Sequence, residues 1–233
     1  MRIAEELLLL AIHPVGGRPV IGAGRLDLAL AGAILADLAL AGRIVVDGGR
    51  VRAAAPGPVP VPAPPRDPEL DGALAMIDAV PGVPAAFAVV RLSGADLRVR
   101  LRNGLIGLGI LAEEEQRILG VLRSSSHPEL NPAPRRVILA RLDATLAGRA
   151  PIEAPAEAPA VAFAARTAAL LVVAHACGLA RALYPEHPDL DRRVGDIAAT
   201  TVAWTAHAVA KAIADTRPGT TASPCAAGGA PAT

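Results

Sequence analysis

Two arginines spaced four residues apart carry the strongest chemical signal in this sequence. Arg98 and Arg102 lie at positions i and i+4 of a predicted helix that begins at Ser93, so both side chains project from one face. No acidic residue lies four positions from either arginine within that helix. Guanidinium groups without a neighbouring carboxylate favour a phosphate, which they bind through two parallel hydrogen bonds. The alternatives are pairing with carboxylates from elsewhere in the fold, or simple solvation.

Three other groups of reactive side chains are better explained by structure than by catalysis. His175 and Cys177 are two residues apart in an apolar stretch, where a helix points them to different sides, so we expect a satisfied core histidine and a small core thiol. The segment Ser124–His127 is predicted to be a polar capping loop, and Glu113–Glu115 a solvated tip between two apolar strands. No zinc, EF-hand or phosphate-loop motif occurs in the sequence. We therefore expect no catalytic residue, no metal, no cofactor and no enzymatic activity.

Composition and charge argue against nucleic acid as a partner. The chain has 233 residues, a net charge of +1, 52% hydrophobic residues and only 2% aromatic residues. A near-neutral chain generates no field that attracts nucleic acid, and scarce aromatic side chains provide no platform on which bases can stack. Abundant alanine, glycine, proline and arginine, with Lys211 as the only lysine, indicate a high-GC bacterial genome.

High hydrophobicity raises the question of a membrane span, and segment length answers it. The longest uncharged apolar run, residues 167–180, is shorter than the roughly 20 residues that a spanning helix needs. The first residues include Glu5 and Glu6, whereas a signal peptide begins with positive charge. Two cysteines provide no disulfide framework. We expect a cytoplasmic protein whose apolar residues form a core or meet a lipid surface.

Helical periodicity dominates the elements that must position the candidate residues. The segment 26–41 is apolar on all sides, which is typical of the central helix of a bundle. Further helices are predicted near 5–10, 68–79, 93–108, 132–146, 166–183 and 199–214, hairpins at 43–52 and 109–127, and a strand or helix at 83–90. The predicted fold is mainly α, a single-domain helical bundle with one or two small β-hairpins. The domain spans residues 1–216, with Pro/Ala-rich loops near 54–66 and 150–160, and a disordered tail follows at 217–233.

Seven segments have the order and spacing of the motifs of one known family. The most distinctive is Leu30–Ile44, in which an aliphatic and acidic helix with a Leu-Ala-Leu sequence ends in Gly-Arg and runs into a hairpin. The others are Glu5–Leu10, Asp67–Leu74, Leu105–Leu111, Ser126–Pro128, Arg166–Tyr184 and Val202–Trp204. Together they cover roughly residues 2–215 and resemble the Golgi phosphoprotein 3 family.

The resemblance implies a non-enzymatic protein that associates peripherally with membranes. Members of this family bind phosphatidylinositol 4-phosphate in a basic pocket with an aromatic wall, so the implied ligand is that phosphoinositide or another anionic lipid headgroup. At the four pocket positions of the family, this chain has Ile21 or Gly22, Ala31, Ala95 and Arg98. The expected headgroup-binding residues are Arg98, Arg102, Arg25 and Arg18.

The resemblance also implies self-association through the 109–127 hairpin. Ile118, Leu119 and Leu122 are expected to contact the membrane interface or a second copy of the chain. The expected partners are an anionic phospholipid headgroup, the inner face of the membrane and a homo-oligomer. The alternative is a soluble protein–protein interaction module that keeps the fold and has lost the lipid pocket.

Overall fold

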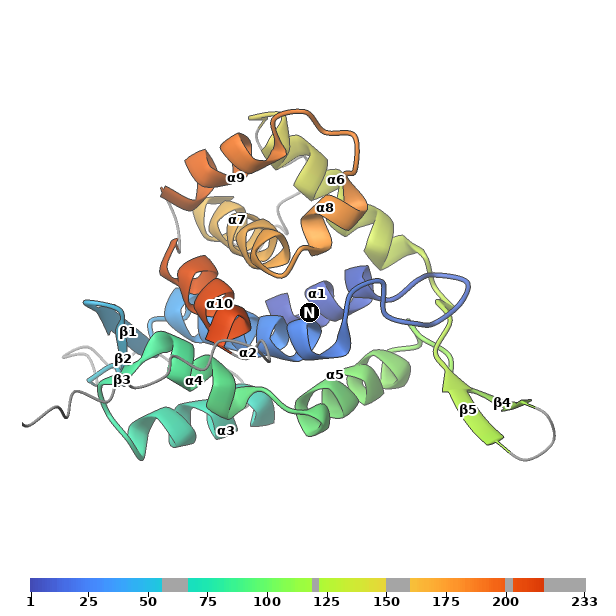
Figure 1. Ribbon diagram of the computed structural model, residues 1–233, viewed down its shortest axis with the longest axis horizontal. Coiled ribbons are helices and arrows are strands. Elements are labelled where there is room, and N and C mark those ends of the chain that lie inside the picture. The colour runs from blue at the N-terminus through green and yellow to red at the C-terminus, as the bar shows by residue number, and fades with distance from the viewer. Residues whose placement is uncertain (56–66, 119–121, 150–159, 200–202, 216–233) are drawn as a thin grey trace, which may run out of the picture.

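The mainly α class is confirmed by the structure, a computed structural model that describes residues 1–55, 67–118, 122–149, 160–199 and 203–215 (Figure 1). The helices in these residues are α1 (Ile3–Ala11), α2 (Ala23–Leu40), α3 (Pro68–Asp78), α4 (Ala85–Leu92), α5 (Ala95–Gly107), α6 (Ala133–Leu146), α7 (Ala160–Ala176), α8 (Leu179–Leu183), α9 (Leu190–Ala199) and α10 (Ala203–Asp215). The strands are β1 (Ile44–Asp47), β2 (Arg50–Ala53), β3 (Val83–Pro84), β4 (Glu114–Ile118) and β5 (Leu122–Ser126). The predicted tail and most of the two Pro/Ala-rich loops lie outside the described residues.

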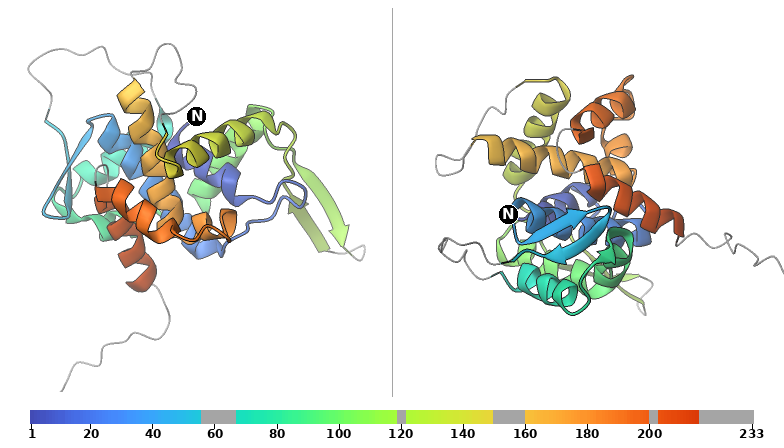
Figure 2. Two further views of the ribbon diagram at one scale, coloured as in Figure 1. Left: turned by 90° about the horizontal axis from the view of Figure 1, so that it is seen from above. Right: turned by 90° about the vertical axis from the view of Figure 1, so that its left-hand side faces the viewer.

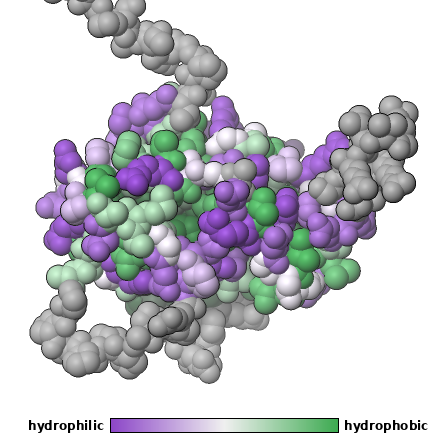
Figure 3. Space-filling model, turned by 90° about the horizontal axis from the view of Figure 1, so that it is seen from below, coloured by the Kyte–Doolittle hydropathy of each residue, from purple (hydrophilic) through white to green (hydrophobic). Residues whose placement is uncertain are grey.

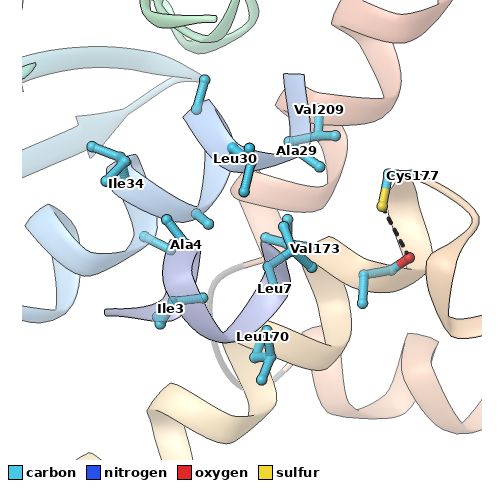
Figure 4. Close-up of a cluster of buried hydrophobic side chains, with 14 of the residues drawn as sticks. Ile3, Ala4, Leu7, Ala29, Leu30, Ile34, Leu170, Val173, Cys177 and Val209 are labelled. Carbon is cyan, nitrogen blue, oxygen red and sulfur yellow. Dashed lines mark hydrogen bonds between the residues drawn. The ribbon is translucent and has the colours of Figure 1, made fainter. Parts of the chain in front are cut away.

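Helix α2 is the centre of the bundle, as its all-round apolar sequence predicts. Every residue from Leu28 to Leu38 is buried, and α1, α3, α4, α5, α7 and α10 pack around the helix (Figures 1 and 2). Gly32 lets α10 approach closely, because a Cβ at this position would overlap Cγ2 of Val209. Figure 4 shows the apolar cluster that α1, α2, α7 and α10 share, including Leu30 and Val173. This core fixes the position of the first turns of α2, which carry Asp27, a residue of the candidate site.

Helix α1 is buried along its whole length and carries acidic groups into the core. The carboxylate of Glu6 accepts a hydrogen bond from Nη2 of Arg141 on α6 at 2.7 Å. On α2, Asp37 accepts hydrogen bonds from the amide of Ile3 at 2.8 Å and from Nη1 of Arg166 at 2.7 Å. Burial raises the pKa of Asp37 to about 6, although the Arg166 charge and both hydrogen bonds oppose this shift. These contacts hold α1 against α2, α6 and α7.

Two small antiparallel sheets accompany the helices. In the predicted 43–52 hairpin β1 pairs with β2, and the two turn residues are Gly48 and Gly49, both at positive φ, rather than the expected Asp-Gly pair. The ambiguous 83–90 segment contains both element types: β3 pairs with β2, and α4 begins at Ala85.

The second hairpin differs from its prediction. Strands β4 and β5 pair from Glu114 opposite Ser126 to Ile118 opposite Leu122. The acidic residue Glu114 therefore lies at the base of a strand rather than at the tip, and Ser124–Ser126 form a strand rather than a capping loop. The reason is that serine residues complete the antiparallel ladder, which a local sequence pattern does not reveal.

Helix boundaries differ from the prediction at several places, and the helix predicted over 166–183 is interrupted between α7 and α8 at Gly178, which has a φ of +86°. Ser93 does not cap α5; its hydroxyl donates to the carbonyl of Val90 at 2.8 Å, and Gly94 occupies the N-cap position of α5. Near the C-terminus, α9 has no counterpart in the prediction, and residue 199, where the last helix was expected to begin, is the final residue of α9. Local competition for the serine hydroxyl explains the difference at Ser93.

The predicted core pair of His175 and Cys177 is half correct. Cys177 is 1% exposed, and burial raises the pKa of its thiol to about 11, as expected for an inert core cysteine. His175 is not a core residue: its side chain is about one-third exposed, and Nε2 lies 2.8 Å from a carboxylate oxygen of Asp191. The two side chains do not form a catalytic pair.

Candidate functional site

Arg98 and Arg102 project from one side of α5, as their spacing predicts, but their surroundings differ. Nη1 of Arg98 lies 3.3 Å from Oδ1 of Asp27, in the second turn of α2. The contact is an ion pair and does not meet the geometry of a hydrogen bond. Oδ1 of Asp27 is buried and has no hydrogen-bond partner. Burial raises the pKa of Asp27, and the charge of Arg98 opposes this shift. Arg98 is therefore paired with a carboxylate from a distant part of the chain, an alternative that the sequence left open.

Arg102 has no hydrogen-bond or ion-pair partner among the residues that the structure describes. Its Nε is buried and unsatisfied. The guanidinium lies near His127, a side chain that is 5% exposed and whose Nε2 also has no hydrogen-bond partner. Burial lowers the pKa of His127, and the positive charge of Arg102 lowers it further, whereas exposed Glu113 opposes both effects. Two nitrogen-bearing side chains with unused hydrogen-bonding capacity thus lie together, an arrangement that suits an anionic ligand.

The loop between α1 and α2 holds His127 in position. Gly17 has a φ of +61° and packs so closely that a Cβ would overlap the backbone nitrogen of His127. The amide of Glu129 donates to the carbonyl of Pro14 at 2.8 Å, which fixes the chain two residues further on. The carboxylate of Glu129 also accepts a hydrogen bond from Nε of Arg135 at 2.9 Å. Sequence reasoning missed His127 as a site residue, because its proximity to Arg102 arises only from this folding of the loop.

The other two predicted arginines lie apart from Arg98. Arg25 precedes Asp27 by two residues and therefore points to another side of α2, where its Nη1 lies 3.9 Å from the position that a Cβ on Gly178 would occupy. Arg18 is exposed in the loop before α2, next to Gly17. The structure thus groups Arg98, Arg102 and His127 but gives no direct contact between them and Arg25 or Arg18.

The positions inherited from the family pocket do not supply further ligand-binding groups. Ala31 is completely buried at the centre of α2, and Ile21 is partly buried and packs against the core. Of the aromatic and basic groups that the resemblance implies, this chain keeps Arg98.

Large apolar side chains are exposed at the same end of the molecule as His127. Val15, Leu108 and Leu130 are 83%, 61% and 66% exposed, and they are three of the four most exposed large apolar residues in the described ranges. The amide of Leu130 donates to the carbonyl of Ile110 at 2.9 Å, and the loop before α2 reaches the same end beside the β4–β5 hairpin (Figures 1 and 2). Of the predicted hairpin residues, Leu119 lies outside the described residues, and only the backbone pairing of Ile118 with Leu122 is described. A polar, cationic spot therefore has exposed apolar neighbours.

The match to a family model assigns the class of protein. The model described as Golgi phosphoprotein 3 (GPP34) matches residues 3–216. The chain belongs to the Golgi phosphoprotein 3 family. A search of curated proteins gives no match. Among the helices of the described residues, none combines the length and the apolar character that crossing a membrane requires.

Proposed function

We propose that this protein binds the phosphate of an anionic lipid headgroup at Arg102 and His127, with Arg98 beside them, and so associates with the inner face of a membrane. The supporting observation is the guanidinium of Arg102, which has no partner in the described part of the chain and whose charge lowers the pKa of the buried, unsatisfied imidazole of His127. A phosphate would accept two hydrogen bonds from the guanidinium and would favour the protonated form of His127. The role is binding without catalysis. Family membership supports this class of ligand, including phosphatidylinositol 4-phosphate.

Headgroup binding needs support from neighbouring residues to hold the protein at a membrane. Each arginine near an anionic surface contributes about 1 kcal/mol, so one guanidinium gives only weak attachment. Arg18 and Arg25 are both exposed and add to this attraction. Val15, Leu108 and Leu130 add apolar burial at the interface. The hairpin that carries Ile118, Leu119 and Leu122 joins the same contact, or pairs with a second copy.

Co-sedimentation with vesicles tests this function. We expect the protein to pellet with vesicles that contain phosphatidylserine or phosphatidylinositol 4-phosphate, more strongly at low salt than at physiological salt, and to stay in solution with pure phosphatidylcholine. Equal behaviour with charged and neutral vesicles would contradict the proposal. A soluble protein-interaction module is the second candidate, and the Asp27–Arg98 ion pair favours it because that contact already neutralises one arginine.

The Asp27–Arg98 pair also gives a variant that should gain affinity. Asp27→Asn removes the carboxylate that pairs with Arg98, so the positive charge of Arg98 can interact with an anionic membrane. One such charge contributes about 1 kcal/mol of binding free energy, which corresponds to roughly fivefold tighter binding. Vesicle titration at low salt measures this gain. Asp196→Asn is the matched control, because Asp196 is an exposed carboxylate on α9. Equal affinities of the two variants would show that Arg98 takes no part in binding.

A further inference from the structure

A concave feature lies on a different side of α5 from Arg98 and Arg102. It is a hollow of about 330 Å³ between α3, α4 and α5, whose apolar wall consists of Ile34, Ala73, Met76, Leu92 and Leu97. A second, much smaller hollow of about 10 Å³ shares Met76 and Leu92 with it and is also lined by Ala88 and Arg91. Figure 3 shows the face of the molecule that carries α3, where apolar side chains gather among polar ones. The headgroup site does not use any of these residues.

The residues that line this hollow have no buried polar atom that needs a hydrogen bond from a ligand. None of the buried, unsatisfied polar atoms of the described residues belongs to a residue that lines it. An occupant that reaches the floor is therefore apolar, since a buried polar group there would lose its hydrogen bonds to water.

The volume of the hollow suits one aliphatic chain better than a helix of a protein partner. A water molecule's share of liquid volume is about 30 Å³ and a methylene group is of similar size, so 330 Å³ holds on the order of ten methylene groups. A helix with its side chains is about 10–12 Å across, too wide to enter such a space. An unbranched aliphatic chain fits the volume of the larger hollow.

The rim indicates the charge of the group at the end of that chain. Arg100 and Glu69 lie at one side of the rim, where Nε of Arg100 donates to both carboxylate oxygens at 2.8 and 3.0 Å. Arg91 lines the smaller, neighbouring hollow and lies over the ring of Phe87, 6.0 Å from its centroid, with no ion-pair partner in the described part of the molecule. Glu69 offsets the charge of Arg100, so the positive charge available to an anionic head is that of Arg91 in the adjoining hollow.

We propose that the hollow between α3, α4 and α5 binds the aliphatic chain of a single-chain anionic amphiphile, such as a fatty acid, with its head beside Arg91. This site is separate from the proposed headgroup site and does not depend on it. The amphiphile is either a free fatty acid or one acyl chain that leaves a membrane. Both sources share the same chemistry at the apolar wall.

Calorimetric titration with saturated fatty acids of increasing length, below their micellar concentrations, tests the proposal. We expect the Kd to fall about fourfold for each added methylene until the hollow is full, and to level off at about ten carbons. The neutral alcohol of the same length should bind more weakly than the acid, and Arg91→Gln should remove this difference. Vesicles with a fluorescent acyl chain, compared with the same free acid, distinguish the two sources.

Gly72→Leu provides the decisive variant. Gly72 lines the hollow on α3, and a Cβ there would meet no atom within 4 Å, so the leucine fills the space without disturbing the fold. We expect its Kd for decanoate to rise at least about tenfold, because the leucine displaces several methylene groups. Gly195→Leu is the matched control, since Gly195 lies in α9 with equally open space around its Cβ and does not line the hollow. The proposal would be overturned if Gly72→Leu and Gly195→Leu both bound decanoate as tightly as the wild type, or if the affinity did not depend on the length of the fatty acid.

The same variant separates other occupants. If the wild-type protein is a dimer in solution and Gly72→Leu is a monomer, the hollow receives a second copy of the chain, and the amphiphile proposal is wrong. Loss of fatty-acid binding in Phe87→Ser with no change in Gly72→Leu would place the chain on the outer side of α4 and would also overturn it. Neither result bears on vesicle binding through Arg102, which fails or succeeds separately.

Discussion

Replacing Arg141 with methionine is expected to lower the free energy of unfolding by about 3–5 kcal/mol. The guanidinium lies 2.7 Å from the carboxylate of Glu6, and the two side chains are 7% and 9% exposed. It also lies over the ring of Phe163, 4.9 Å from the ring centroid. Removing it leaves a buried carboxylate whose other arginine, Arg166, lies 3.8 Å away. The cost comes from a buried carboxylate on α1 that loses its closer partner and keeps only the longer contact with Arg166.

Urea denaturation of three variants separates this effect from a general effect of substitution. Arg136→Met is the matched control, because Arg136 is the exposed neighbour of the buried Arg135 on the same helix and should change stability little. The double variant Glu6→Leu with Arg141→Met should recover most of the lost stability, since neither charge then remains. If Arg141→Met is no less stable than Arg136→Met, the pair does not hold α1 in place.

Arg102→Glu is expected to weaken binding to anionic vesicles about thirtyfold at low salt. The change removes one positive charge and adds one negative charge at the headgroup site, and two charges near an anionic surface correspond to about 2 kcal/mol. The loss should shrink as salt screens the exposed part of the contact. Arg102 packs without a hydrogen bond or ion pair to any described residue, so the substitution breaks no such contact.

A second charge reversal controls for the change in net charge. Arg193 is an exposed residue of α9, which lies on the other side of the bundle from α5 (Figure 1). Arg193→Glu alters the net charge of the protein by the same amount and should affect affinity only slightly. Equal losses in the two variants would indicate attraction by overall charge, without a site at Arg102.

Local sequence pattern predicts much of this fold, because the pattern repeats within each element. The apolar residues of 26–41 predict a central helix, and α2 is buried from Leu28 to Leu38. Turn residues predict the β1–β2 hairpin, although Gly48 and Gly49 form its turn. Helix α9 was missed although Leu190, Val194 and Ile197 recur at helical spacing and face the core, so a pattern that could have revealed it was present.

The candidate site is harder to predict, because its partners come from distant parts of the chain. The i, i+4 spacing places Arg98 and Arg102 correctly on one side of α5, but it does not show that Asp27 pairs with the first of them. Nor does it show that His127 lies within the electrostatic influence of the second, since the position of His127 depends on the packing of Gly17. Resemblance to a family carries over the fold more reliably than the pocket: Ala31 and Ile21 pack in the core of this chain.

The pKa of His127, measured by NMR with and without a short-chain, water-soluble phosphatidic acid, tests phosphate binding at this site most directly. In the free protein, burial and Arg102 hold this pKa below its ordinary value of about 6.5. A bound phosphate places negative charge beside the imidazole, so we expect the pKa to rise, and by linkage the affinity for the lipid to increase as the pH falls through the interval between the two values. The imidazole resonances of His175 on α7 and His207 on α10 serve as internal controls, and adding the lipid should leave their positions unchanged. A lipid that binds while the His127 pKa stays unchanged would contradict a phosphate site at Arg102 and His127.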